Sequence, residues 1–491
     1  MPRKSKFDKS KTCIKCKTAR GNIVIRHAVY CKTCFTPLVV TKYKRCLDPH
    51  INAAPDGQRR STLKASGNLL IGLSGGLGST VLLDITSRCY FSTKSSTEDG
   101  RKGGKAHPKN DRVWKQASVC FVDTSRAFSE GVTKDRSEDI RAMVEQHKEF
   151  EFIVLRLEDA FDISWWKQLG GYVPSSDIRA NLANEDLVIT EAHLQSSDPV
   201  ASLRSYLSSL PTATAVRSSI NTLARLLLLH TARSMQCSHL LLGTSLTSLS
   251  ISLINSIAQG GGFNVLEESF EEWTPQIARS AQDASSDSPH LAGGVCTVRV
   301  VRPLRDIGMK ECAAWAWWNG LQVVGKDRTF DPDGKQTIGG LTKDFIVGLE
   351  RDYPSTVSTI ARTCAKLAPK NEPDGQCIVC ERPAQRGIQD WKSRISIRSL
   401  EPPSPHPPHV ASDDPPPISL TPHLCYACHT TLISRSSRST VQNGAEASLA
   451  PLPVWTRSAL VESDAADVMG TKRLVDHEDM RNAIGEFLLH D

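Results

Sequence analysis

One short stretch, LLIGLSGGLGS at residues 69–79, decides the fold. Its apolar start, 69–73, predicts a buried strand, and residues 79–88 predict a helix. Three glycines lie in the turn between them, where they let a ligand approach the backbone closely. The turn amides and the start of the helix then form an anion nest suited to phosphate. A purely structural turn is the alternative interpretation of the same residues.

The turn does not match the two best-known nucleotide loops. No Gly-Lys-Ser/Thr follows, so it is not a Walker loop. The glycine spacing also differs from the dinucleotide fingerprint, and no acidic residue for a ribose can be identified. The candidate anion site consists of Ser74, Gly75, Gly76, Gly78 and Ser79.

Beyond this turn, short apolar runs alternate with helix-like stretches. Further strands are predicted at 119–123, 152–157, 239–243 and 297–301. Helices are predicted at 135–148, 213–235, 245–258 and 306–318. This alternation predicts a doubly wound α/β fold, in which a parallel sheet is covered by helices on both faces.

The chain is 491 residues long, enough for two or three domains. Polar, linker-like or proline-rich stretches interrupt the pattern at 92–118, 279–294 and 401–423, and the last of these holds nine of the 27 prolines. We therefore expect a basic N-terminal zinc-ribbon module (1–64), an α/β domain with the first two inserts (65–370), and a C-terminal cysteine-pair module split by the third (371–491).

Charge is unevenly distributed along the chain. Residues 1–64 contain 16 Lys/Arg and three acids, a local charge of +13, which leaves −6 for the rest of a chain whose net charge is +7. A basic arm on a mildly acidic body is typical of nucleic-acid binders, although it is also compatible with a solubilising tail. No apolar run approaches the ~18 residues of a membrane span, and no secretory signal is recognisable, so we expect a protein of the reducing cytosol or nucleus without membrane contact.

Eight of the 15 cysteines form four Cys-x-x-Cys pairs. In a reducing compartment such pairs indicate metal ligands rather than disulfides. The first two pairs are 14 residues apart, close to the spacing of a four-cysteine zinc ribbon. The last two flank the proline-rich insert and can share a second zinc, because a long loop costs little free energy to close; a thioredoxin-like redox pair is the weaker alternative. The predicted ligands are Cys13, Cys16, Cys31 and Cys34, and then Cys377, Cys380, Cys425 and Cys428.

At this point a family resemblance becomes apparent. The Ser-Gly-Gly-x-x-Ser loop resembles the pyrophosphate loop (PP-loop) of the ATP pyrophosphatases that adenylate tRNA bases. With cysteine pairs at both ends, the chain resembles the cytoplasmic tRNA 2-thiolation protein 2 family, the partner of the catalytic thiolase subunit. The similar stretches are CIKC (13–16), VIR (24–26), YCKTCF (30–35), LLGTSLTSL (241–249), GGGF (260–263), RPLRD (302–306) and IGEFLL (484–489).

The resemblance implies a heterodimer with the catalytic subunit. Together the two subunits place sulfur on C2 of the wobble uridine in the tRNAs for Lys, Glu and Gln, on a base that already carries a 5-methoxycarbonylmethyl group. The sulfur comes from a thiocarboxylated ubiquitin-related modifier. The basic module would then contact tRNA phosphates, with Arg26, Lys42, Lys44 and Arg45 as candidates.

Three departures from the active relatives point to a loss of chemistry. Gly78 stands where those relatives carry aspartate, so no carboxylate can help to hold Mg²⁺ there. Residues 243–248 lack the carboxylates and the imidazole of the matching active-site stretch, and 205–214 lack the Cys-x-x-Cys needed for sulfur transfer or an iron–sulfur cluster. Cys237, at the start of an apolar strand, is expected to be buried.

We therefore expect a degenerate PP-loop subunit with no catalytic residue, one or two structural zinc sites, and doubtful ATP binding. Two alternatives stay open. The chain is itself an ATP-dependent tRNA sulfurtransferase if its partner completes a shared active site. It is a zinc-ribbon scaffold or nucleic-acid-binding protein unrelated to thiolation if the resemblance misleads.

Overall fold

The structure is a computed structural model. It describes residues 12–51, 65–91, 113–129, 132–173, 177–183, 186–192, 198–275, 297–325, 337–367, 373–385, 387–388, 419–433 and 449–460. The predicted linker 279–294, most of the other two inserts, and the closing IGEFLL stretch lie outside the described residues.

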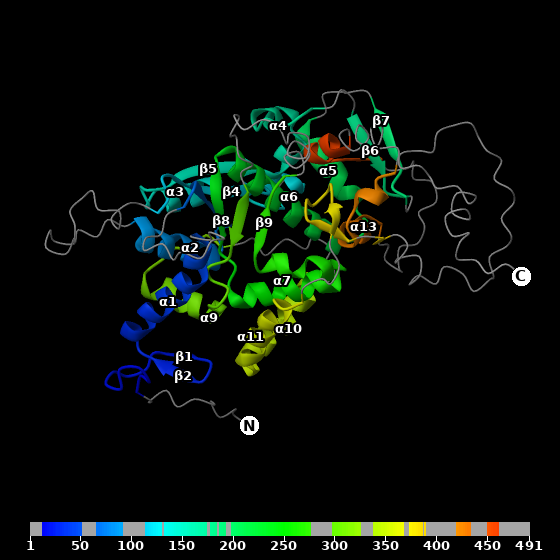
Figure 1. Ribbon diagram of the computed structural model, residues 1–491. Coiled ribbons are helices and arrows are strands. Elements are labelled where there is room, and N and C mark those ends of the chain that lie inside the picture. The colour runs from blue at the N-terminus through cyan, green and yellow to red at the C-terminus, as the bar shows by residue number, and fades with distance from the viewer. Residues whose placement is uncertain are drawn as a thin grey trace, which may run out of the picture.

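A six-stranded sheet forms the centre of the molecule (Figure 1). Its order is β5-β4-β3-β8-β10-β9, and all neighbours are parallel except β9, which runs antiparallel to β10 at the edge. The strands are β3 (Asn68–Gly72), β4 (Ala117–Asp123), β5 (Glu151–Arg156), β8 (Cys237–Leu242), β9 (Glu271–Trp273) and β10 (Val298–Val301). The predicted doubly wound α/β fold is confirmed.

Side-chain alternation along the central strand separates the core into two halves. Leu69 and Ile71 of β3 pack into one hydrophobic cluster, and Leu70 packs into the other. Strands buried on both faces are apolar at nearly every position, which is why continuous apolar runs located them in the sequence. The first half contains α1 (Lys32–Ile51), α2 (Leu77–Thr86), α3 (Ser137–Val144) and α9 (Met309–Trp318). The second contains α5 (Pro199–Ser209), α6 (Ala213–Ser234) and the C-terminal cysteine pairs.

The remaining helices and short helical turns lie around this sheet. The helices are α4 (Ile163–Gln168), α7 (Leu246–Ala258), α10 (Ile338–Asp352), α11 (Pro354–Cys364) and α13 (Tyr426–Ile433). The turns are η1 (Ser87–Phe91), η4 (Ser125–Ala127), η5 (Leu157–Phe161), η6 (Gly261–Glu268) and η7 (Thr421–His423). Helices α10 and α11 pack on α7 around a third, smaller cluster that includes Leu253 and Ile346. None of the described helices is both long and apolar enough to cross a membrane.

Small sheets complete the fold. Two are antiparallel hairpins, β1 (Ile23–Ile25) with β2 (Ala28–Tyr30), and β11 (Pro373–Gln376) with β12 (Pro383–Gln385). A third sheet joins β6 (Asp177–Asn181) and β7 (Ile189–Ala192) to β13 (Leu449–Pro451), which comes from far along the chain.

The N-terminal segment packs on the main domain. Phe35, Val39, Tyr43, Leu47 and Ile51 recur every four residues along α1 and are buried in the same cluster as β3 and α2. Each side chain of this kind contributes about 1.5–3 kcal/mol when it is fully buried. This helix therefore draws stability from the α/β core as well as from any metal bound near its start.

The first insert ends earlier than expected. The sequence analysis placed residues up to Ser118 in a polar surface loop, but β4 begins at Ala117 and Trp114 is fully buried. The reason is that Trp114 packs against Tyr90, Phe91 and His239. The buried Trp114 side chain thus holds the end of an otherwise polar stretch against the core.

Candidate metal centres and glycine loop

The first four cysteines converge at the N-terminal end of α1, and we call them the first centre. Cys13 and Cys16 lie on a tight knuckle, closed by the Lys17 amide donating to the Cys13 carbonyl (2.8 Å). Lys17 takes a positive φ of 57° to close this turn. Cys31 immediately precedes α1, and Cys34 lies in its first turn. The β1–β2 hairpin spans the sequence between the two pairs and folds them together.

The second four cysteines repeat this design, and we call them the second centre. The Glu381 amide donates to the Cys377 carbonyl (2.7 Å), and Glu381 takes a φ of 52°. Cys425 immediately precedes α13, and Cys428 lies in its first turn. The amide of His429 donates to the Cys425 carbonyl (3.0 Å), which joins this cysteine to the helix.

The sulfur positions fit one metal ion in each centre. Within each group the four sulfurs all lie within 4.8 Å of one another. A tetrahedral ion with metal–sulfur bonds of about 2.3 Å needs sulfurs about 3.8 Å apart. The Cys16–Cys31 pair is 3.9 Å apart and the Cys380–Cys425 pair 3.7 Å apart. An iron–sulfur cluster binds its cysteines through different irons and needs wider spacing, so a single ion fits better.

Metal binding requires thiolates, and in each centre hydrogen bonds favour the thiolate form of some of the cysteines. Hydrogen bonds from the Thr18 side chain and then from the backbone amide of Ala19 lower the pKa of Cys16 to about 6. Burial opposes ionisation of Cys377, but hydrogen bonds from the other three thiols of its centre leave its pKa well below the usual value. Each centre therefore holds at least one thiol whose pKa lies below the usual value, whereas burial raises the pKa of Cys34 to about 12.

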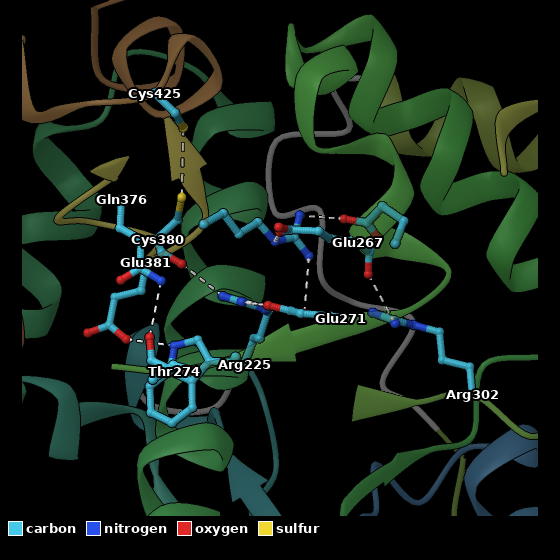
Figure 2. A network of polar contacts seen from close by, with 12 residues as sticks. Arg225, Glu267, Glu271, Thr274, Arg302, Gln376, Cys380, Glu381 and Cys425 are labelled. Atoms are coloured by element: carbon cyan, nitrogen blue, oxygen red, sulfur yellow. Dashed lines mark hydrogen bonds and ion pairs between the residues drawn. The ribbon is translucent and has the colours of Figure 1, made fainter. Parts of the chain in front are cut away.

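The second centre is surrounded by buried and partly buried charged residues (Figure 2). Arg225 of α6 donates through Nη1 to the carbonyl of Cys380 (2.9 Å). Its Nε also donates to Glu271 of β9 (3.1 Å), with which Arg225 forms a buried ion pair. The knuckle of the second centre is thus joined by one arginine to both α6 and the edge strand.

A second arginine, Arg382, directly follows Glu381 in the chain and extends this network of charged residues. It donates through Nη1 to Glu268 of η6 (2.6 Å), and its Nε lies 3.5 Å from Glu267. Burial alone would raise the pKa of Glu268, but the positive charges of Arg382 and Arg302 lower it to about 2. Arg302, at the end of β10, also donates to the carbonyl of Glu267 (3.2 Å).

Aromatic residues pack on the other side of this knuckle. Glu381 accepts a hydrogen bond from Trp273 Nε1 (2.9 Å) and lies 3.3 Å from His230 Nε2. The His230 ring is enclosed by Trp166, Trp273 and Trp455. The Glu381 carboxylate at the end of the knuckle is therefore held in the core by Trp273 and His230.

The glycine loop lies where the sequence predicted, between β3 and α2. Ser79 donates through Oγ to the Gly76 carbonyl (2.9 Å), and Ser74 and Ser79 share a hydroxyl contact of 3.2 Å. Gly75 takes a φ of +71°. Its carbonyl accepts from the amide of Gly325 (3.0 Å), so the segment that follows α9 lies against the loop. The loop hydroxyls are thus occupied with closing the loop itself.

Gly78 lies in close contact with a second glycine. A Cβ at Gly78 would be 2.1 Å from the carbonyl oxygen of Gly243, which follows β8. A Cβ at Gly243 would in turn be 2.4 Å from the Ser79 amide nitrogen. Real Cβ atoms essentially never come within 3.0 Å of another heavy atom in this way. The position that carries aspartate in the active relatives therefore has no room for any side chain.

The four candidate tRNA contacts occupy different settings. Arg26 is exposed on the turn between β1 and β2. Lys42 forms an ion pair with buried Glu311 (2.6 Å) and Arg45 forms one with Asp306 (2.9 Å), while Lys44 lies over the Tyr90 ring. Cys237 is fully buried.

The charged network beside the second centre could not be predicted from the sequence. Isolated arginines and glutamates look like surface residues, and Glu381 and Arg225 are 156 positions apart in the chain. Two signals were available: the GGGF stretch lies in and next to η6, and the RPLRD stretch starts with Arg302. Both stretches contribute to the surroundings of the second centre.

Comparison with known proteins gives a consistent description. The family model for cytoplasmic tRNA 2-thiolation protein 2 matches residues 337–430, which include the second centre. A relative of that description from Danio rerio is 25% identical over 416 residues, covering 76% of this chain and 72% of the relative. Its counterpart from Homo sapiens is 27% identical over 425 residues, covering 77% and 72%. One from Phaeosphaeria nodorum is 25% identical over 454 residues, covering 87% and 96%.

A solved structure also resembles the chain. It is the U34-tRNA thiolase NcsA from Methanococcus maripaludis with its 4Fe-4S cluster, at a TM-score of 0.43 and 15% identity, covering 79% of this chain and 98% of that chain. This similarity is too weak to support an inference about function.

Proposed function

The chain belongs to the cytoplasmic tRNA 2-thiolation protein 2 family, and on that basis we propose that it is a non-catalytic subunit required for 2-thiolation of the wobble uridine in cytoplasmic tRNAs for Lys, Glu and Gln. It acts as a heterodimer with the catalytic thiolase subunit in the cytoplasm. The catalytic subunit takes sulfur from a thiocarboxylated ubiquitin-related modifier, and this chain contributes tRNA binding and support for its partner.

The contact between Gly78 and Gly243 carries the non-catalytic part of the proposal. Catalysis of adenylation needs groups that act on a triphosphate and its Mg²⁺. A carboxylate cannot enter at residue 78 without moving the Gly243 backbone. The loop after β8 offers hydroxyls instead of acids, and Ser245 uses its own to cap α7. Cys237, the thiol at the start of β8, is fully buried.

We assign zinc to both centres. Four thiolates in tetrahedral reach of one ion favour zinc or a single iron among biological metals. Zinc would hold the knuckle against the helix start in each centre and would supply no redox chemistry. No step of thiolation is assigned to either ion.

Deleting the gene for this chain tests the thiolation role. The proposal expects loss of 2-thiolation at the wobble uridine, measured by mass spectrometry of digested tRNA, and recovery when the chain is supplied again. Normal thiolation in the deletion strain would exclude the role and would favour a scaffold unrelated to thiolation.

Reconstitution with the purified catalytic subunit tests the non-catalytic part. Alanine at Ser74, Ser79 and Cys237 of this chain should leave turnover within about two-fold of wild type, because the proposal gives these side chains no chemical role. Near-complete loss of turnover with assembly and tRNA binding intact, or conversion of ATP to AMP by the isolated chain, would contradict it.

Gly78→Ala tests the closed loop independently of activity. Because the new Cβ meets backbone rather than a flexible side chain, we expect about 1–3 kcal/mol of destabilisation. Gly348→Ala in α10 is the matched control, since a Cβ there meets nothing within 4 Å. That change should raise stability by roughly 0.5–1 kcal/mol. Equal stability of the two variants would mean that the loop has room for a side chain.

A further inference from the structure

Helix α9 brings an exposed tryptophan to the first centre. Lys42 of α1 pairs with Glu311 at the start of α9 (2.6 Å), and the Phe35 ring lies 4.9 Å from that of Trp318 at its end. The two contacts are seven residues apart on each helix, so α9 lies antiparallel to α1, and the two can be seen side by side in Figure 1. Phe35 directly follows Cys34. The last turn of α9 therefore lies beside the first centre.

The three tryptophans of this helix have different environments. Trp315 is buried and donates through Nε1 to Asp84 (2.8 Å). Trp318 packs against the core through Phe35. Trp317 is 83% exposed. An indole in water contributes nothing to the core, and large aromatic side chains left this exposed are typical of binding surfaces.

The N-terminal segment that packs beside α9 is strongly basic. Residues 12–47 contain eight Lys/Arg and no Asp or Glu. Six of the eight are exposed, and within the described part of the chain five of these six form no ion pair. These five are Lys15, Lys17, Arg20, Arg26 and Lys32. Residues 312–325, which contain Trp317, have no charged side chain.

We propose that this surface binds a single-stranded RNA segment, with an unpaired base stacked on Trp317 and the neighbouring phosphates on the cations around the first centre. A cationic surface next to an exposed aromatic ring is the arrangement that recognises unpaired nucleotides. The proposal rests on the proposed role in tRNA thiolation, and it identifies the surface through which the chain contacts RNA in that role. Lys42 and Arg45 are already paired with carboxylates and are not part of it.

The position of the segment after α9 supports this placement. It runs from Asn319, two residues after Trp317, to Gly325, whose amide donates to the Gly75 carbonyl of the glycine loop (3.0 Å). An RNA strand stacked on Trp317 would therefore lie between the first centre and the end of the sheet where the loop is found. A protein partner is the other possible occupant of an exposed tryptophan, but the basic and acid-free segment 12–47, which packs beside α9, favours a polyanion.

The test measures RNA affinity of the full-length chain by fluorescence anisotropy. The probes are a fluorescein-labelled RNA hairpin with an unpaired uridine-rich loop and a duplex of the same stem without the loop. Trp317→Ala should weaken hairpin binding by roughly 5- to 100-fold, the usual effect of losing one stacking ring, and leave duplex binding nearly unchanged. Trp317→Phe should recover most of the affinity. Phe345→Ala, on α10 and 59% exposed, is the matched control and should have no effect.

The salt dependence of RNA affinity distinguishes the stacking contribution of Trp317 from the contribution of the basic side chains. Trp317→Ala should leave the slope of log affinity against log salt unchanged, whereas each alanine at Lys15 or Arg20 should reduce it by about 0.7. Metal content and thermal unfolding of each variant verify the fold. Unchanged hairpin affinity in Trp317→Ala would overturn the proposal. The proposal would also be overturned if Trp317→Ala weakened binding of the catalytic subunit and left RNA affinity intact. Because the deletion experiment does not depend on Trp317, failure here is distinguishable from failure of the proposed function.

Discussion

The two centres have the same local structure in different surroundings. Each consists of a Cys-x-x-Cys knuckle, closed by a residue with positive φ, and a second pair at the start of a helix. The middle residues of the first knuckle, Ile14 and Lys15, are exposed, with Ile14 at 58%. Those of the second, Ile378 and Val379, are buried in the core. The same metal-binding unit thus forms a surface in one place and part of the core in the other.

This difference shows what a metal contributes in each place. Around the first centre, α1 packs on the α/β core independently of the knuckle. At the second, Arg225 and Arg382 join the knuckle to α6, η6 and β9, so its position is shared with the rest of the domain. We expect the second centre to be structural and the first to serve binding.

The largest expected difference is between single cysteine substitutions. Cys380→Ser should abolish the cooperative unfolding transition or lower it drastically, because a buried centre loses its ion and its core position together. Cys16→Ser should leave the main transition in place. Thermal unfolding by circular dichroism compares the two, and similar loss in both variants would remove the distinction.

Loss of a largely buried arginine has the next largest expected effect. Arg382→Met leaves Glu268 without its main partner and should cost about 3–5 kcal/mol. The control is Arg45→Met, which breaks an exposed pair with Asp306 and should cost no more than about 1 kcal/mol. Urea denaturation measures both. A cost for Arg382→Met as small as that of the control would mean that the network does not hold the second centre.

Matched substitutions within the knuckles sharpen the comparison further. Ile378→Lys removes a buried apolar side chain and places an ammonium group in the core, at a cost of about 3 kcal/mol or more. Ile14→Lys, at the corresponding position of the first knuckle, should change stability by less than about 0.5 kcal/mol. Equal effects in denaturant titrations would show that the surroundings do not distinguish the knuckles.

The smallest effect concerns binding alone. Lys15→Ala should leave the unfolding temperature unchanged and weaken tRNA binding modestly, since one phosphate contact is lost. Lys310→Ala, an exposed lysine at the other end of α9, is the control and should not alter tRNA affinity. Filter binding at several salt concentrations distinguishes these outcomes. A fall in stability of Lys15→Ala would place the first knuckle in the core.

Much of this arrangement was predictable from the sequence, for physical reasons. Buried parallel strands are continuous apolar runs, so β3, β4 and β8 were located directly, and the cysteine spacing grouped the ligands of both centres. Edge strand β9 reads Glu-Glu-Trp and gave no such signal. Its glutamate Glu271 is buried only because Arg225, distant in sequence, lies opposite it.

Local sequence pattern was also insufficient to predict which side chains of α9 and α1 are exposed and which are paired. Trp315, Trp317 and Trp318 are too close in sequence for periodicity to separate the exposed ring from the buried ones. The candidate tRNA contact Lys42 is occupied by Glu311, 269 positions away. Long-range partners of this kind are determined by packing and not by local sequence pattern.

Metal release from the zinc-loaded full-length chain tests the account most directly. A chelating dye would follow zinc while near-ultraviolet circular dichroism follows the core and anisotropy follows RNA binding. The account predicts two separate phases: a fast release of one ion that abolishes RNA binding but leaves the core signal, then a slow release that coincides with its loss. Release of both ions in one phase, or early loss of the core signal with RNA binding retained, would contradict it.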